Sequence, residues 1–390
     1  RQKFTSLETT TEGISMAKQA NKAKSQAPTI SDNSSLVTRL IFDSPRSLFI
    51  GTLLTVLFIK VGTSPIPNFG VVAAIASNPF QYPTPQDPDG FYQMWNWLTP
   101  YLAYLLHLNT GNKFLALHFI LAIGFIAIVT IALFRKLPEH QARTAFIIFL
   151  AMPVSGSVLF WICYDAPALF LMALALFVFK NKYALFALGV LLGMQDFEPT
   201  VVSFSAILLA TWLSKKNSEN SDLNFKSPSF VIAGAITGRL ILTILFDRWN
   251  LQATSGRLAW FQKHLNEMSQ QVMQSPGLCL WAILGLAWVV LFLHIASDIK
   301  ISRTILIPIL FLSVLVFTTA DKTRVMALAT FPLLSVMWLK NESFLKAFNK
   351  KVTVTLGLIW LVAPWVFIWE TNLYTSTFFG EQPGLQSTML

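Results

Sequence analysis

The chain has few charged residues. Asp, Glu, Lys and Arg make up 12% of its 390 residues, whereas soluble domains usually carry about 25%. Hydrophobic residues make up 54% of the chain, and they fall in runs long enough to cross a membrane. The scarcity of charge therefore excludes an ordinary soluble domain and predicts an all-α, polytopic transmembrane helix bundle.

The sequence also lacks the patterns that mark familiar catalytic and metal sites. It holds two cysteines, Cys163 and Cys279, each in or beside an apolar segment. This favours small buried hydrophobes over a disulfide framework or a zinc site. No HExxH, paired CxxC, P-loop, GxSxG or Rossmann fingerprint occurs. The chemistry must therefore be sought in polar residues scattered along the chain.

The net charge of +10 does not indicate a nucleic-acid partner. Basic residues lie in short segments between apolar runs, where they set the orientation of helices in a membrane. With the N-terminus inside, most of the 29 Lys and Arg residues fall on the inner side. We therefore expect a multi-pass integral membrane protein with a cytoplasmic N-terminus, and the missing cysteine framework favours a bacterial inner membrane.

The apolar runs divide the chain into three regions with about eleven crossings. Residues 1–46 are predicted to be a largely disordered cytoplasmic segment, residues 47–370 the bundle, and residues 371–390 an outer tail. The predicted crossings are Ser47–Thr63, Phe114–Phe134, Thr144–Ile162, Pro167–Phe179, Tyr183–Met194, Val201–Leu213, Val231–Phe246, Gly277–Ala296, Thr304–Thr319, Val325–Leu339 and Val352–Trp369.

Two features of this topology are less regular. Tyr183–Met194 and Val201–Leu213 are short, and a broken or re-entrant pair packed inside the protein is the alternative reading. Lys60 lies near the end of the first crossing, and its long side chain is expected to reach outward to the membrane surface.

Two long outer loops are predicted, residues 64–112 and residues 247–275. The first contains no Lys or Arg, and its aromatic segment Phe91–Leu108 is expected to lie along the membrane surface, with a true crossing as the alternative. The second predicts an amphipathic surface helix, because its apolar residues recur at helical spacing. These residues are Leu258, Phe261, Leu265, Met268 and Val272.

The stretch QYPTPQDPDG (Gln81–Gly90) in the first loop is the strongest candidate for chemistry. Its prolines fix the backbone and exclude a long helix or a central strand. Asp87 and Asp89 could take a proton from an acceptor hydroxyl, or hold a divalent cation such as Mg²⁺ or Mn²⁺. A solvated turn is the alternative, since Asp and Pro favour turns.

Three further acids fall at outer ends of the predicted crossings. Asp165 precedes Pro167, while Asp196 and Glu198 lie together in QDFEPT. Short outer connections hold such groups close to the bundle, where ionisable residues are functional candidates. The structural alternative is that Asp165 and Glu198 cap the helices that follow them.

Cations on the outer side are the candidates for binding a phosphate. The connection ADKTRV carries Asp321, Lys322 and Arg324 against the general charge bias, and Arg324 could grip a phosphate with two parallel hydrogen bonds. A local ion pair with headgroup contacts is the alternative. Arg239 lies within an apolar run and must face the bundle interior or a wet cavity, with a carboxylate or phosphate as partner.

Two more residues complete the candidate site. His264 in the second loop could transfer protons near neutral pH, although a surface histidine is usually without such a role. Trp95 follows Asp87 and Asp89 closely, and sugars stack on tryptophan rings.

This arrangement resembles the GT-C superfamily of integral-membrane glycosyltransferases. The resemblance rests on a first crossing, a long outer loop with the acids of DPD, surface-lying aromatic helices, and a multi-helix bundle over residues 47–370. It implies a polyprenyl-phosphate-linked sugar as donor and a glycan, lipid or protein as acceptor. It further implies that Asp87 or Asp89 is the general base or metal-associated acid, and that Arg239, Lys322 or Arg324 holds the lipid phosphate. The chain has no large soluble C-terminal domain, unlike some members of the class.

Two other functions are compatible with the sequence. A transporter could bind an ion or proton at broken helices around Gly193–Pro199, although no repeat is evident. A lipid-linked glycan polymerase or ligase would instead rely on Arg257 and His264 of the second outer loop.

Overall fold

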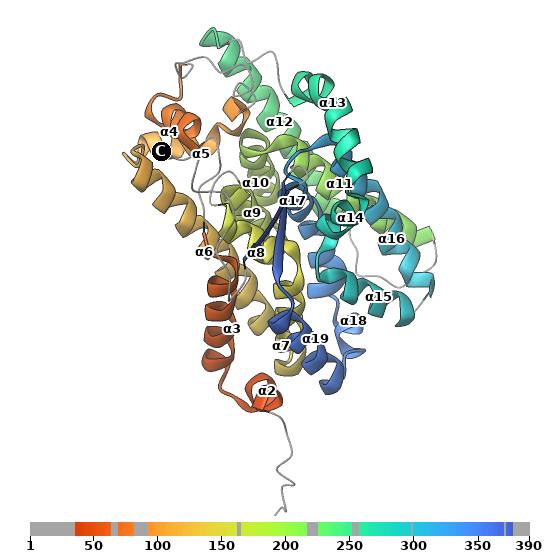
Figure 1. Cartoon of the computed structure of the whole chain (residues 1–390). Helices are drawn as coiled ribbons and strands as arrows, with labels where there is room; N and C mark the ends of the chain where they lie inside the picture. The colour runs from red at the N-terminus through yellow and green to blue at the C-terminus, as the bar shows by residue number, and fades with distance from the viewer. Residues whose placement is uncertain are drawn as a thin grey trace, which may run out of the picture. The chain divides into compact units, whose positions relative to one another are not determined.

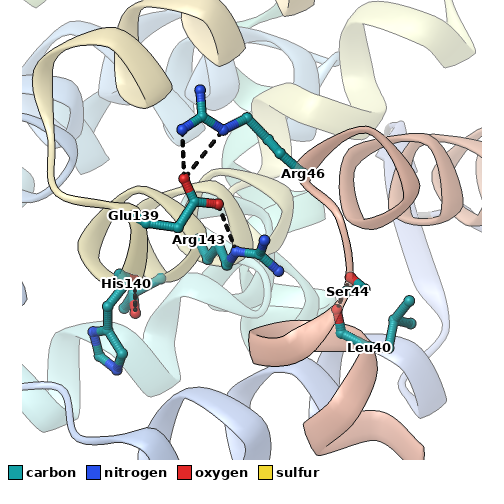
Figure 2. Close-up of polar contacts among 7 residues, drawn as sticks. Leu40, Ser44, Arg46, Glu139, His140 and Arg143 are labelled. Atoms are coloured by element: carbon teal, nitrogen blue, oxygen red, sulfur yellow. Dashed lines mark hydrogen bonds and ion pairs between the residues drawn. The ribbon is translucent and has the colours of Figure 1, made fainter.

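The computed structural model describes residues 36–63, 69–81, 93–161, 165–216, 225–251, 257–297, 299–369 and 372–376. The chain divides into two compact units, Arg1–Ser44 and Pro45–Leu390. The described part of the first unit holds the short helix α2 (Leu36–Thr38) and the π-helix η1 (Arg39–Asp43). Ser44 Oγ donates a hydrogen bond to the carbonyl oxygen of Leu40 across this π-helical turn (Figure 2). The predicted disorder of the first residues lies outside the described part.

The second unit is built mainly from helices, with one short pair of strands (Figure 1). In chain order its elements are α3 (Arg46–Val61), α4 (Phe69–Ser77), α5 (Leu98–Leu105), α6 (Gly111–Lys136), α7 (Glu139–Ala151), α8 (Pro153–Phe160), α9 (Asp165–Ala173), η3 (Leu174–Val178), α10 (Lys182–Gln195), α11 (Phe197–Lys216), α12 (Lys226–Arg248), α13 (Arg257–Gln274), α14 (Pro276–Leu284), α15 (Ala287–Ser297), α16 (Ile299–Ser313), η4 (Val314–Thr318), α17 (Lys322–Leu334), η5 (Ser335–Leu339), α18 (Glu342–Lys346), α19 (Lys350–Val362), β1 (Trp365–Trp369) and β2 (Asn372–Ser376).

The described part contains three helices that are long and apolar enough to cross a membrane. They are α6, α11 (over Phe197–Lys215) and α12, and the count rises to five if the bent pairs α7–α8 and α14–α15 each form one span. Shorter apolar helices cover Asp165–Val178, Lys182–Gln195 and Arg303–Thr318. A helical protein with membrane-type helices is thus confirmed, whereas eleven crossings are not. The two short predicted crossings Tyr183–Met194 and Val201–Leu213 correspond to α10 and α11, two separate helices with only Asp196 between them.

Two predicted crossings are bent rather than straight. The α7–α8 pair bends by 57° at Met152, where Pro153 starts a new helix and cannot donate to the preceding turn. The α14–α15 pair bends by 77° at Gly285, whose φ of +54° is readily adopted only by glycine. Proline and glycine are the usual causes of such breaks.

The predicted final crossing, Val352–Trp369, is wrong in its second half. Helix α19 ends at Val362, and after Pro364 the chain forms strand β1, which pairs antiparallel with β2. The sequence WVFIW of β1 is aromatic and β-branched, which favours a strand. The ribbon is tied to α17, because the amide of Ile368 donates to Thr323 Oγ1 over 2.9 Å.

Helices α10 and α12 pack in very close contact through two pairs of glycines. Gly189 and Gly193 of α10, and Gly234 and Gly238 of α12, each meet the backbone of the other helix. A Cβ atom on Gly193 would lie 2.1 Å from the carbonyl oxygen of Ala235, and one on Gly238 would lie 2.1 Å from that of Val190. Glycines four residues apart permit this approach, as they do between helices in membranes.

The aromatic segment of the first long loop is folded against the bundle. Residues 93–96 form a 3₁₀ turn and α5 has eight residues, about 12 Å of helix, which is too short to cross a membrane. Trp97 is buried, stacks on Tyr101 with ring centroids 4.3 Å apart, and donates from Nε1 to the carbonyl oxygen of Pro79 over 2.8 Å. The described part of Phe91–Leu108 therefore holds no helix long enough for the alternative of a true crossing, and α4 is a further short helix of this loop.

The chain direction defines two ends of the second unit. Helices α6, α9–η3 and α17–η5 run in parallel, because Asp165 and Arg324 meet near the starts of α9 and α17 while Lys136 and Lys340 both reach η3. Helix α10 returns, so α11 starts on the same side as α9. We call the side where α9, α11 and α17 begin the Asp165 end, and the opposite side the Lys340 end.

Lys60 does not reach outward. Its side chain is 3% exposed, and its ammonium donates to the backbone carbonyl oxygen of Trp360 while lying 5.0 Å from the centre of that ring. A second carbonyl, that of Leu361, lies 3.5 Å from Lys60 Nζ. The predicted position of Lys60 at the membrane surface is therefore wrong: the lysine caps the C-terminal turn of α19, where a positive charge is favourable.

Candidate functional site

The two acids with the strongest sequence argument, Asp87 and Asp89, lie outside the described residues. Their assignment as catalytic or metal-binding groups stays a prediction. Among the residues that the structure describes, no group of three or more His, Cys, Asp or Glu side chains could hold a metal ion. The site must therefore be built from the other candidates, which form two clusters at the Asp165 end.

The first cluster centres on Arg239 of α12. Its guanidinium carbon lies 3.3 Å from the centre of the Trp95 ring and 5.5 Å from that of Phe197. Its Nη2 lies 3.4 Å from Glu198 Oε1, and its side chain is 19% exposed. Arg239 was predicted to have a carboxylate or phosphate as partner, and the structure gives it a carboxylate that is partly exposed. The partner is Glu198 of the neighbouring helix, rather than the sequence neighbour Asp247.

The glycine pairs explain why Arg239 lies there. Gly238 precedes Arg239 directly, and Gly193 lies close to the end of α10, where the chain turns into α11. Because α10 and α12 touch at these glycines, the guanidinium of α12 comes beside the first turn of α11, which carries Phe197 and Glu198. Backbone packing without side chains therefore sets the geometry of the cluster.

The turn that carries Trp95 is held to the same corner. Thr99, at the start of α5, donates from both its backbone amide (3.0 Å) and its Oγ1 (2.6 Å) to Oε1 of Gln195 at the end of α10. Trp95 also packs on Phe246 of α12, with ring centroids 5.0 Å apart. These contacts bring the residues just after the DPD stretch against Arg239.

Asp196 and Glu198 have different surroundings although they are two residues apart. Asp196 is 2% exposed and occupies the junction between α10 and α11, where its carbonyl oxygen accepts from Thr200 Oγ1 over 2.6 Å. Glu198 lies in the first turn of α11 with its side chain 40% exposed. A carboxylate in the first turn of a helix is favourable, and Glu198 in addition pairs with Arg239.

The second cluster centres on Arg324 of α17. Arg324 Nη2 lies 3.0 Å from Asp321 Oδ2, and Arg324 Nε lies 3.4 Å from Asp165 Oδ2. The Asp165 carboxylate is 2% exposed and the Arg324 side chain 13%. The local ion pair in ADKTRV is therefore present, and it extends to Asp165, which is 159 residues away in the chain. At such low exposure, removal of one partner would leave an uncompensated charge.

Lys322 is completely buried beside this cluster. Its ammonium donates to Oε1 of Gln271 over 2.8 Å and lies 3.4 Å from the carbonyl oxygen of Thr319. Gln271 belongs to α13, the helix predicted in the second outer loop, which is thus confirmed as a helix. Its Met268 is buried, as its apolar stripe predicts, whereas Leu265 is 39% exposed.

His264 lies apart from the charge clusters. It is in α13, where its Nδ1 lies 2.8 Å from Oε2 of Glu267, one turn further along the same helix. Such a pair is typical of a helix surface. No contact among the described residues joins His264 to Arg239 or Arg324, and the role of His264 in the site stays a prediction.

The two clusters share one end of the bundle, since α11 packs against both α12 and α17. A cavity of about 30 Å³ lies elsewhere, at the breaks Met152–Pro153 and Gly285–Leu286, and includes Lys60 and Thr323 in its lining. Neither Arg239 nor Arg324 lines it. At this volume it accommodates only water-sized groups.

Comparison of the chain with protein-family models, with curated proteins and with solved structures finds no match. The class of protein that the observations define is therefore a helical protein with membrane-type helices and buried ion pairs at one end. These ion pairs are the basis of the function proposed below.

Two further structural features had signals in the sequence that could have been used, and a third had none. The spacing of Gly189 with Gly193, and of Gly234 with Gly238, indicates a close helix pair. Pro364 followed by WVFIW indicates the end of α19 and a strand. Trp161 and Trp365 join an aromatic cluster around Phe367, for which no local pattern exists.

Proposed function

We propose that the chain is a polytopic membrane glycosyltransferase with about eleven crossings, which uses a polyprenyl-phosphate-linked sugar on the non-cytoplasmic face. The Asp165 end is then the outer side, and a bacterial inner membrane is the proposed location. The observation that carries the proposal is the pair of arginines, Arg239 and Arg324, each held by carboxylates at the same end of the bundle.

The proposed reaction divides its parts between the acidic loop and these arginines. Asp87 or Asp89 takes the proton from the acceptor hydroxyl, whose oxygen attacks the anomeric carbon of the sugar. The bond between that carbon and the phosphate oxygen breaks, and its electron pair leaves with the polyprenyl phosphate. An arginine stabilises the negative charge of the departing phosphate.

Trp95 supports the position of the acceptor in this proposal. Its ring lies in the segment that follows the acidic loop, and Arg239 covers one of its faces. The stacked pair would place an aromatic surface and a cation next to each other, which suits an acceptor sugar ring next to the phosphate of the donor. Lys322 is completely buried and bound to Gln271, so it fits the support of α17 better than direct contact with a lipid.

The test uses purified protein in liposomes with a panel of polyprenyl-phosphate-linked sugars, and it measures release of polyprenyl phosphate. Each donor is tested together with glycan, lipid and protein acceptors, because the proposed reaction needs an acceptor hydroxyl. We expect Asp87→Asn and Asp89→Asn to lower the rate about a hundredfold or more for the acid that acts as base. Asp247→Asn is the matched control, because Asp247 is exposed at the end of α12. Equal thermal unfolding of all three variants excludes misfolding. Full activity of both loop variants would overturn the proposal.

A transporter is the second candidate, and a specific observation favours it. Two bent helix pairs meet at the cavity beside the buried Lys60, and broken helices in membranes often form ion or solute sites. The size of this cavity limits the solute to a small ion. Uptake of a solute by liposomes that hold no lipid-linked sugar, with loss of uptake in Lys60→Met, would support this candidate over the enzyme.

A further inference from the structure

Three lysines gather at the Lys340 end around the last turn of η3. Lys136 is the final residue of α6, Lys180 lies between η3 and α10, and Lys340 follows η5. The Lys136 ammonium donates to the carbonyl oxygen of Phe177, and the Lys340 ammonium donates to that of Leu176 over 3.0 Å. Three separate segments of the chain thus bring their cations to one π-helical turn.

The cluster is accessible and carries an excess of positive charge. The side chains of Lys136, Lys180 and Lys340 are all exposed. In the described part of the chain, no ion pair joins any of the three to a carboxylate. The acid nearest to Lys136 in sequence, Glu139, is held by Arg46 Nη2 at 2.6 Å and by Arg143 Nε at 2.8 Å (Figure 2).

Backbone carbonyls explain only part of this arrangement. A lysine near a helix end stabilises the unpaired carbonyls there. Each ammonium has three N–H donors, however, and a carbonyl oxygen carries only partial charge. Lys180 adds a third full charge to a turn whose two carbonyls already have donors. Three like charges side by side repel each other unless an anion lies between them.

The position of the cluster at the end of a candidate membrane span indicates the source of that anion. Helix α6 is the longest of the candidate membrane spans, with 26 residues, and Lys136 is its last residue. The end of a span lies at the level of the lipid headgroups, where lysines attract anionic lipids. We propose that Lys136, Lys180 and Lys340 form a binding site for the phosphate of an anionic phospholipid.

The experiment measures binding of phosphatidylglycerol to the detergent-purified full chain by native mass spectrometry and by the shift of its thermal midpoint. Lys136→Gln/Lys180→Gln/Lys340→Gln is compared with Lys182→Gln/Lys215→Gln/Lys351→Gln, which removes the same charge from the same end. Lys182 and Lys215 lie on the rings of Tyr183 and Phe225, outside the cluster. We expect at least about tenfold weaker lipid binding in the first variant and wild-type binding in the second.

Further arms distinguish the sources of the anion and the effect of folding. Phosphatidylcholine, which has no net charge, should bind equally to wild type and both variants. If inorganic phosphate alone stabilises the wild type as much as phosphatidylglycerol does, the lipid assignment is wrong. If both triple variants lose binding equally, the site is not at these lysines. Should the first variant fail to fold, Lys340→Gln alone replaces it, with a smaller loss expected and unchanged binding contradicting the site. None of these results depends on glycosyl transfer.

Discussion

The two ends of the second unit handle charge in opposite ways. At the Asp165 end, arginines pair with carboxylates across helices, as Arg324 does with Asp165. At the Lys340 end, lysines lie on backbone carbonyls at the last turn of η3, with their side chains exposed. Buried charges need partners within the protein, whereas exposed charges at a membrane surface can pair with lipid headgroups. The difference indicates a specific, preorganised site at one end and an anchoring surface at the other.

The largest expected effect follows from removing the contact that builds the Asp165 end. In Gly193→Leu/Gly238→Leu, each new side chain meets a backbone carbonyl oxygen, so α10 and α12 must separate. We expect a loss of more than about 3 kcal/mol in the free energy of unfolding, or no folded protein at all. Thermal unfolding and size-exclusion chromatography in detergent measure it. Gly51→Leu is the control, because no atom lies within 4 Å of an added Cβ there; similar behaviour of both would refute the role of the glycine contact.

The next effect concerns the buried ion pair. Arg324→Met leaves the Asp165 carboxylate buried without this partner, which should cost about 3–5 kcal/mol in the free energy of unfolding. Asp165→Leu in the same chain should restore part of that loss, because the buried Asp165 carboxylate is then no longer left without Arg324. Unfolding of the two single variants and the double variant gives the coupling between the residues. Strictly additive losses would show that Asp165 and Arg324 are not coupled.

A smaller effect is expected at Arg239. Arg239→Ala removes a cation from the face of Trp95, a contact of about 1–2 kcal/mol at this low exposure. Lysine retains the charge but lacks the planar guanidinium, so Arg239→Lys should keep only part of the stabilisation that Arg239→Ala removes. The free energy of unfolding is compared with that of Arg248→Ala, an exposed arginine on the same helix. Equal values for the two alanine variants would mean that the stack contributes nothing.

The smallest expected effect is the pH dependence of lipid binding at the Lys340 end. Although the Lys340 side chain is exposed overall, desolvation of its ammonium, followed by the charges of Lys136 and Lys180, lowers its pKa to about 8. Lys340 is charged below that pH and neutral above it, so binding of phosphatidylglycerol should weaken as the pH rises through about 8. Losing one charge of three should lower the affinity up to about fivefold between pH 7 and 9. Lys340→Arg should abolish this pH dependence, since arginine stays charged.

The sequence predicted what local pattern controls. Low charge and long apolar runs were enough to predict a helical protein with membrane-type helices, and the spacing of apolar residues located α13. Arg239 required a carboxylate or phosphate partner on general grounds, and in the structure Glu198 is that partner. These predictions succeeded because each depends on composition or on residues within one helix.

The remaining features depend on partners that are distant in the chain. Lys60 could not be placed from its neighbours, because the carbonyl it binds lies on α19, 300 residues away. The pairing of Arg324 with Asp165 likewise requires α9 and α17 to be adjacent. The bends at Met152 and Gly285 were missed because their flanking residues are apolar throughout, so that a hydropathy pattern cannot distinguish one straight span from two bent pieces.

The hydrogen bond between Ile368 and Thr323 links the last strands to the charged start of α17. Thr323 lies between Lys322, which Gln271 holds, and Arg324, which Asp165 holds. An affinity tag or fluorescent reporter attached soon after β2 would therefore disturb Thr323 and, with it, the positions of Lys322 and Arg324. Reporter fusions intended to leave the Asp165 end undisturbed belong at the other terminus.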